Sequence, residues 1–182
     1  YFTMNRVDNR KVKDLWVINS IAEPRPTLET YKYWMPGEKD APVDHLYVFD
    51  VAAKQGKELD ITQFKDQSLA IWSAPAKPSS RDDEFRPLLW HGTAQKFYIA
   101  RTSRDLKRID ICEVDVQAGK VKAVIEERLN TYVEIRRLGL VNGGQEMIQW
   151  SERDGWGHFY LHDANGKVKN AITSGPWHAE DI

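Results

Sequence analysis

Apolar and polar residues alternate with a period of two through residues 147–173. Three short runs each have one apolar face, formed by Ile148, Trp150, Phe159, Leu161 and Ile172. This pattern is typical of half-buried β-strands. The dipeptides Asp154-Gly155 and Asn165-Gly166 separate the runs and accept the positive φ of tight hairpin turns. The segment therefore predicts a three-stranded antiparallel meander, which needs similar neighbours to bury its faces.

The same scheme recurs twice earlier in the chain. Residues 96–127 contain strand patterns at 97–100, 108–115 and 121–125, and residues 46–50 lead through a polar turn to 58–61. Gly-Lys pairs at Gly56, Gly119 and Gly166 mark the expected turns, at intervals of 63 and 47 residues. An all-strand repeat of this size indicates blades of a β-propeller. An antiparallel sandwich with coincidental turns is the alternative.

We therefore predict an all-β fold, a partial β-propeller of about three antiparallel four-stranded blades. The approximate blade units are 1–66, 67–127 and 128–182, within a single partial domain. Residues 2–7 and 13–19 are interpreted as a hairpin around the turn at 8–10. Further strands are expected at 28–35, 68–73 and 85–90. Pro24 and Pro26 exclude a central strand between residues 22 and 27.

The length and the net charge of the chain limit the classes of protein to which it can belong. The chain has 182 residues and a formal net charge of -1. A complete propeller needs about 4–8 blades, so we expect a piece of a longer protein. The near-neutral charge argues against a broad nucleic-acid or membrane footprint, and no apolar run approaches the roughly 18 residues of a membrane helix.

Cysteine and histidine offer no cofactor site. The single Cys112 stands in an apolar alternation, which predicts a buried, inert thiol. His158 and His162 are four residues apart, and on a strand this spacing is too wide for one metal ion. We expect neither a metal nor another cofactor.

Several segments resemble dipeptidyl peptidase IV-like proteins of the prolyl oligopeptidase family of serine peptidases. They are residues 28–37, 43–50, 108–112 and 150–160, the last beginning Trp-Ser-Glu-Arg-Asp-Gly-Trp. The resemblance covers nearly the whole chain and falls within the N-terminal β-propeller of the family. Such enzymes remove N-terminal dipeptides, usually after proline or alanine. The resemblance implies that the propeller gates access to the active site and helps to bind the peptide substrate.

In this family catalysis belongs to a Ser-Asp-His triad in a separate C-terminal α/β-hydrolase domain, whose serine lies in a Gly-x-Ser-x-Gly elbow. None of the eight serines here stands in such a motif. The chain is therefore expected to be inactive alone, with the hydrolase domain and the peptide as its partners. The resemblance also implies a periplasmic or cell-envelope location. Open blade edges predict self-association of the isolated fragment.

Arg136 and Arg137 are the candidate substrate-binding residues, because an arginine of the family in this region reaches toward the substrate-side cavity. A surface or inter-blade salt bridge is the competing interpretation. Glu126-Glu127 resembles the adjacent glutamates that hold the substrate amine in the family, but that pair lies upstream of the segments matched here. For Glu126-Glu127 we expect a solvated strand end. A solvated hairpin is expected for the basic residues Arg101, Arg104, Lys107 and Arg108.

A β-rich binding module is the alternative function. It would recognise a protein or a glycan through exposed aromatic residues, with Tyr31, Tyr33, Trp34, Trp156 and Trp177 as candidates. Burial of these rings between sheets would remove the basis for this idea. An intact small enzyme is the third possibility, but no convergent nucleophile, base and orienting group is visible.

Overall fold

A computed structural model describes residues 1–75, 81 and 89–180. The described part consists of antiparallel strands and one short 3-10 helix, η1 (Asn142–Gly144), so the predicted all-β class is confirmed. The strands are β1 (Phe2–Asp8), β2 (Asp14–Asn19), β3 (Thr27–Lys32), β4 (Val43–Asp50), β5 (Gln55–Leu59), β6 (Ser68–Ile71), β7 (Lys96–Thr102), β8 (Arg108–Asp115), β9 (Lys120–Arg128), β10 (Gly139–Val141), β11 (Glu146–Ser151), β12 (His158–Asp163) and β13 (Val168–Ala171).

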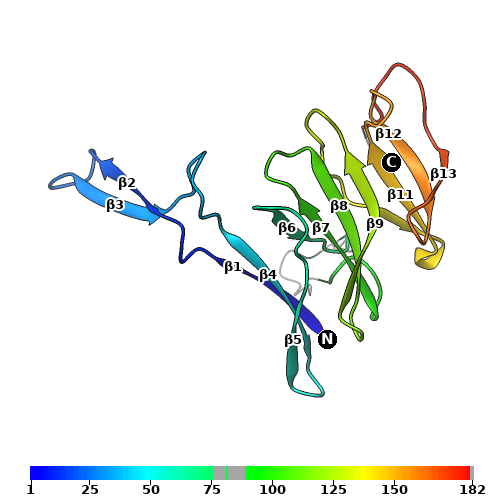
Figure 1. Ribbon diagram of the computed structural model, residues 1–182, viewed down its shortest axis with the longest axis horizontal. Helices are drawn as coiled ribbons and strands as arrows, with labels where there is room; N and C mark the ends of the chain where they lie inside the picture. Colours follow the sequence, from blue (N-terminus) through cyan, green and yellow to red (C-terminus); the bar gives the residue numbers. More distant parts are fainter. Residues whose placement is uncertain (76–80, 82–88, 181–182) are drawn as a thin grey trace.

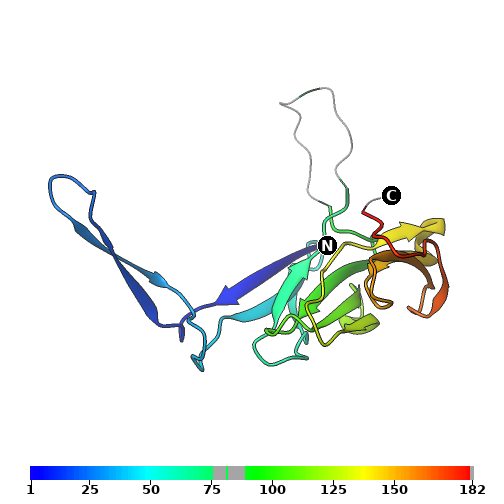
Figure 2. The same ribbon diagram turned by 90° about the horizontal axis from the view of Figure 1, so that it is seen from above.

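Four sheets divide these strands (Figure 1). The first sheet has the order β1-β4-β5, the second β6-β7-β8-β9 and the third β10-β11-β12-β13, while β2 and β3 form a separate two-stranded ribbon. Figures 1 and 2 show the first, second and third sheets side by side, with the ribbon projecting away from them. The strand expected at 85–90 lies mostly outside the described residues, and Trp90 forms an isolated bridge with Ser73.

The meander predicted at residues 147–173 is present as β11, β12 and β13. Gly155 and Gly166 have φ values of 89° and 85°, as the turn dipeptides require. The Asp163 carboxylate accepts hydrogen bonds from the backbone N–H groups of Asn165 (2.8 Å) and Lys167 (3.0 Å), which closes the second turn. Local turn chemistry therefore determines this sheet.

The hairpin expected between residues 2–7 and 13–19 is wrong. β1 pairs with β4 and β2 pairs with β3, so the ribbon is inserted between two paired strands. In the β1-β4 register Phe2 lies opposite Phe49, and their rings stack with centroids 4.7 Å apart. Cross-strand aromatic pairs stabilise antiparallel strands, and this contact favours the long-range pairing over the local one.

Gly56 does not form the expected turn. It lies inside β5, and the turn before it ends at Lys54, which has a φ of 54°. A side chain at position 56 would come within 2.6 Å of the Phe49 ring, so the glycine is required by packing. At Gly119 and Gly166 the turn interpretation is confirmed by positive φ values.

Two apolar layers join the three sheets. The layer between the first and second sheets contains Leu46, Val48, Leu59, Ile61, Phe97, Ile99, Cys112, Val114 and Val116. The layer toward the third sheet contains Trp72, Tyr98, Ala100, Ile109, Ile111, Val124, Ile125, Val133, Leu138 and Met147. Because β7 and β8 contribute alternate residues to both layers, the second sheet is buried on both faces.

The third sheet departs from the predicted single apolar face. Trp150 and Phe159 are buried as expected, whereas Ile172 is exposed. The opposite face is also buried, and it carries the polar side chains of Gln149 and His162. Alternation of apolar and polar residues therefore did not mark a solvated face in these strands.

Candidate functional site

The segment between β9 and β10 carries both candidate arginines. Arg136 lies over the indole of Trp150, with its guanidinium carbon 3.8 Å from the ring centroid. Its Nε donates to Glu134 Oε1 at 2.8 Å, and one terminal nitrogen donates to the Glu180 carbonyl at 2.6 Å. These contacts within the third-sheet region leave Arg136 as a packing residue.

Arg137 is arranged differently. It is exposed, and in the described part of the chain its hydrogen bond runs from one terminal nitrogen to the carbonyl of Ser73, at 2.8 Å. Ser73 follows β6, so this bond connects the second and third sheets. A guanidinium has further donors, which are suited to a carbonyl or a carboxylate.

A groove of about 890 Å³ begins beside this contact. Its walls come from β1 and from the residues around Trp72 and Trp90, and Ser73 is part of its lining. Nearby His91 is buried, and desolvation lowers its pKa, with the positive charge of Arg137 acting in the same direction. Arg137 therefore lies next to a concave surface whose described lining residues include no acidic group.

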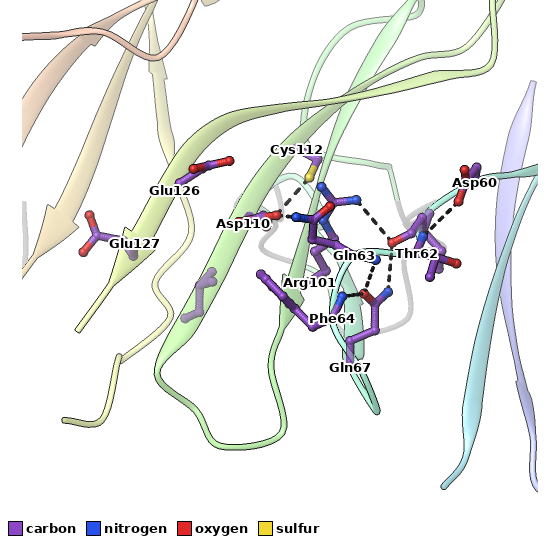
Figure 3. Close-up of polar contacts among 12 residues, drawn as sticks. Asp60, Thr62, Gln63, Phe64, Gln67, Arg101, Asp110, Cys112, Glu126 and Glu127 are labelled. Atoms are coloured by element: carbon purple, nitrogen blue, oxygen red, sulfur yellow. Dashed lines mark hydrogen bonds and ion pairs between the residues drawn. The ribbon is translucent and has the colours of Figure 1, made fainter. Parts of the chain in front are cut away.

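The expected solvated end at Glu126-Glu127 is wrong for Glu127. Its side chain is buried and accepts hydrogen bonds from Ser151 Oγ (2.8 Å) and a terminal nitrogen of Arg153 (2.7 Å). Glu126 is exposed, because adjacent residues on β9 point to opposite faces (Figure 3). Two carboxylates directed apart cannot close on one ammonium group.

The expectation of a solvated hairpin at the basic residues is also partly wrong. Arg101 is buried, and its Nε donates to Asp110 Oδ2 at 3.0 Å while a terminal nitrogen donates to the Ile61 carbonyl at 3.2 Å (Figure 3). Asp110 is completely buried and also pairs with Arg128. Buried charges are costly unless they are paired. Arg101 therefore joins the second sheet to the segment after β5.

Sequence reasoning missed the polar cluster between the second and third sheets. Gln149 and Arg153 are joined by a 2.7 Å hydrogen bond, and Arg153 also contacts Glu127 and Ser151. Gln149 stands between Ile148 and Trp150, and a polar residue inside an apolar strand was the available signal. The pattern did not show that Glu127 on β9 belongs to the same cluster through Arg153 and Ser151.

The histidines do not converge. His158 is held by Thr173 Oγ1 (3.0 Å) and by the Gly175 carbonyl (2.9 Å), while His162 contacts the Gly166 carbonyl (2.9 Å). Within the described residues, no three His, Cys, Asp or Glu side chains are grouped to hold a metal ion.

Burial raises the pKa of the Cys112 thiol to about 11. Residues 1–75 and 89–180 also contain no helix long and apolar enough to cross a membrane.

The candidate aromatic residues form no common platform. Tyr31 and Tyr33 are exposed on the ribbon, whereas Trp156 and Trp177 are exposed beside the third sheet. Trp34 is half-buried, with the guanidinium of Arg104 3.5 Å from its ring centroid. Burial therefore does not remove the binding alternative, but the rings belong to separate surfaces.

Comparison with solved structures gives the same architecture. The crystal structure of Porphyromonas gingivalis dipeptidyl peptidase 4 superposes with a TM-score of 0.78 at 22% identity, covering 98% of this chain and 23% of that one. A putative dipeptidyl aminopeptidase IV from Bacteroides ovatus ATCC 8483 gives a TM-score of 0.71 at 20% identity, covering 99% and 26%.

Curated relatives include proteins of Trichophyton and Arthroderma. A probable dipeptidyl peptidase 4 from Trichophyton verrucosum (strain HKI 0517) is 25% identical over 142 residues, which is 75% of this chain and 17% of the relative. Dipeptidyl peptidase 4 from Arthroderma otae is 24% identical over 148 residues, with 78% and 17% coverage. The chain thus spans about a sixth of their length. The family model for the dipeptidyl peptidase IV (DPP IV) N-terminal region matches residues 1–182, and the chain therefore belongs to this family.

Proposed function

We propose that these residues are part of the β-propeller of a serine exopeptidase that removes N-terminal X-Pro or X-Ala dipeptides. The match of the N-terminal-region model to the whole chain carries this proposal. The first, second and third sheets would be consecutive blades, packed face to face. Catalysis would belong to a C-terminal α/β-hydrolase domain, because the chain has no Gly-x-Ser-x-Gly elbow.

The propeller would gate access and help to bind the peptide, and Arg137 is the residue best suited to contact it. Its guanidinium is exposed beside the groove, whereas Arg136 is already stacked on Trp150 and bonded to Glu134. An arginine can bind a substrate carbonyl or carboxylate through paired donors. Arg136 would hold the segment in place.

An X-Pro chromogenic dipeptide assay tests the proposal, with the full-length protein and the 182-residue chain side by side. We expect activity in the full-length protein alone. In that protein Arg137→Ala should raise KM about 10-fold, because a hydrogen bond to a charged group is worth at least about 1.4 kcal/mol. kcat should stay unchanged if the contact is equal in ground and transition states.

Matched variants separate binding from folding. Arg10→Ala, at an exposed turn arginine, should leave KM unchanged. Arg136→Ala should lower the melting temperature more than it changes KM. Activity of the 182-residue chain, after contamination is excluded, would overturn the assignment of catalysis to another domain, and an unchanged KM in Arg137→Ala would overturn the role of Arg137.

The binding-module alternative is favoured by Trp156 and Trp177, which remain 42% and 47% exposed. These rings lie against His178 and His158, with centroids 5.1 Å apart in each pair. Titration with glycans while tryptophan fluorescence is recorded tests this function. A saturable change in fluorescence that is lost in Trp156→Ala would support the binding function. If the fluorescence does not change, the peptidase proposal is the only one that remains.

On the resemblance alone we propose a periplasmic or cell-envelope location. Fractionation of the producing cells, followed by detection of the full-length protein, tests it. Recovery with a cytoplasmic marker would contradict the proposal.

A further inference from the structure

The outermost strands of the first and second sheets each carry a lysine that reaches the next sheet (Figure 1). Lys57 of β5 donates from Nζ to the carbonyl of Ala118 at 2.7 Å. Lys122 of β9 donates from Nζ to Asn165 Oδ1 at 3.3 Å. Each acceptor lies in the outer hairpin turn of the following sheet, between β8 and β9 or between β12 and β13. We call these two contacts the lysine latches.

The two lysines occupy the same place in their strands. In the first sheet Gln55 pairs with Asp50 at the end of the turn, and in the second sheet Lys120 pairs with Asp115. The latch lysine follows two positions later in both strands. Residues two apart on a strand point to the same face, so the position determines the direction of the side chain.

A glycine allows each turn to approach the preceding sheet. Gly119 has a φ of 64°, and a Cβ at this position would lie 2.5 Å from Lys57 Nζ. Gly166 has a φ of 85°, and a Cβ there would overlap the carbonyl oxygen of Val124 on β9. A side chain at either glycine would push the turn away from the preceding sheet. The Gly-Lys pairs of the sequence therefore serve contacts between sheets as well as turns.

The third sheet has a lysine at the same place. Asp163 N donates to the Lys167 carbonyl at 2.9 Å, which closes the turn before β13, and Lys169 follows two positions later. Within residues 1–75 and 89–180 no sheet follows the third. The Lys169 ammonium pairs instead with Glu146 of β11, in its own sheet, and the lysine side chain remains 48% exposed.

The face of the third sheet that is turned away from the second sheet is apolar and partly open. Met147 belongs to the layer between these two sheets, so its neighbour Ile148 points to the opposite face. Leu161 lies opposite Ile148 and shares this face. Asn170 lies opposite Leu161, and Ile172 stands two residues beyond it on the same face, 46% exposed. We call Ile148, Leu161 and Ile172 the outer face.

The corresponding faces of the other two sheets are covered by the sheet that follows. Leu46 and Val48 of the first sheet are buried against the second, and Ile109 and Ile111 of the second sheet are buried toward the third. The matched region is about a sixth of the length of the curated relatives, so a protein of that length has residues for further sheets. A further sheet is therefore the occupant that the pattern favours for the outer face.

We propose that Lys169 forms a third lysine latch, in which its ammonium binds an oxygen atom in the outer hairpin turn of a further sheet of the full-length protein. Lys169 lies at the rim of the outer face, because its partner Glu146 and Ile148 are two residues apart on β11. A lysine ammonium has three donors, so Glu146 can orient it while the turn binds it. The inference rests on the proposed function in that the sheets are taken as consecutive blades.

Limited acetylation of the lysines in the full-length protein, followed by peptide mass spectrometry, tests the proposal. Lys120 is the reference, because it is exposed and its ammonium has no hydrogen bond or ion pair with the described residues. Exposed contacts of a charged group are weak, so we expect Lys57 and Lys122 to be acetylated about 3-fold more slowly than Lys120. Lys169 should be acetylated at least as slowly as these two.

Two variants of the full-length protein separate the possible causes of protection. Asn165→Ala removes the acceptor of Lys122 and should raise the acetylation rate of that lysine to the rate of Lys120. Glu146→Gln removes the ion pair within the third sheet. In this variant Lys169 should remain protected, because the turn of the further sheet still binds its ammonium.

Three results would overturn the proposal. In Glu146→Gln, acetylation of Lys169 at the rate of Lys120 would show that its own sheet alone holds this lysine. An unchanged rate of Lys122 in Asn165→Ala would show that the latch contact itself is not made. Protection of Lys169 only at high protein concentration would show that another molecule covers it.

The readout does not depend on peptidase activity. A full-length protein without activity, but with Lys169 protected, would contradict the proposed function and leave the third latch in place. An active protein in which Lys169 is unprotected would contradict the latch alone.

Discussion

Replacement of Trp150 by alanine is the most direct test of the packing at the third sheet. The indole is 6% exposed, packs against Phe159, and donates from Nε1 to the Ala179 carbonyl at 2.7 Å. The guanidinium of Arg136 covers its other face. The variant therefore removes apolar burial, one hydrogen bond and one cation–π contact together.

The magnitude follows from these contacts. About 200 Å² of indole surface at about 25 cal/mol per Å² amounts to about 5 kcal/mol. The hydrogen bond adds about 1 kcal/mol and the partly exposed cation–π contact about 0.5–1 kcal/mol. Because extended-chain areas are upper limits and neighbours relax into the cavity, we expect Trp150→Ala to destabilise by about 3–5 kcal/mol.

Urea unfolding of the 182-residue chain, followed by far-ultraviolet circular dichroism, measures this effect without relying on tryptophan emission. With a slope of about 2 kcal/mol/M, the midpoint should fall by about 2 M. Trp150→Phe keeps most of the apolar area and should lose about 1–2 kcal/mol through the unpaired carbonyl. Tyr132→Ala, at a 59% exposed ring, is the surface control. A loss below about 1 kcal/mol in Trp150→Ala would refute the assigned register.

Three further predictions use the same assay. Glu127→Ala should lower the free energy of unfolding by about 2–3 kcal/mol, because it removes the buried carboxylate of an ion pair. At the exposed neighbour, Glu126→Ala should change the free energy of unfolding by no more than about 0.5 kcal/mol. Desolvation lowers the pKa of His91 and His162 in the folded chain, so stability should be complete above about pH 6.5 and should fall as the pH drops from there toward the lowered values; a flat profile would contradict neutral burial. Gly166→Ala should cost at least about 2 kcal/mol, because its Cβ would overlap the carbonyl of Val124 at a φ of 85°; a change below about 0.5 kcal/mol would place this turn elsewhere.

Local patterns predicted the third sheet well because the information is local there. The Asp154-Gly155 and Asn165-Gly166 dipeptides determine where the strands reverse, and the period of two determines their extent. The pairing of β1 with β4 could not be obtained in this way. It joins Phe2 to Phe49 across an inserted ribbon, whereas the sequence favours the shorter connection between neighbours.

The sequence patterns also failed to predict which charged residues are buried, and this failure too has a physical cause. Asp110, Glu127 and Arg101 look like surface residues, because a charged side chain is rarely buried without a partner. Their partners lie on other strands, and in the case of Glu127 on another sheet. Pattern analysis of single strands carries no information on contacts between sheets. The sequence pattern also offered no reason to distinguish Arg136 from Arg137, although the two side chains pack differently in the structure.

The buried polar cluster explains how the candidate site is positioned. An apolar layer alone tolerates sliding of one sheet over another, whereas the directional contacts of Glu127 with Ser151 and Arg153 oppose sliding of β9 against β11. The segment that carries Arg137 connects these two sheets, and Arg137 bonds to Ser73 across them. Loss of Glu127 should therefore weaken the Arg137 contact as well as the fold. The polar residues of the interface would then help to position the arginine beside the groove as well as to stabilise the fold.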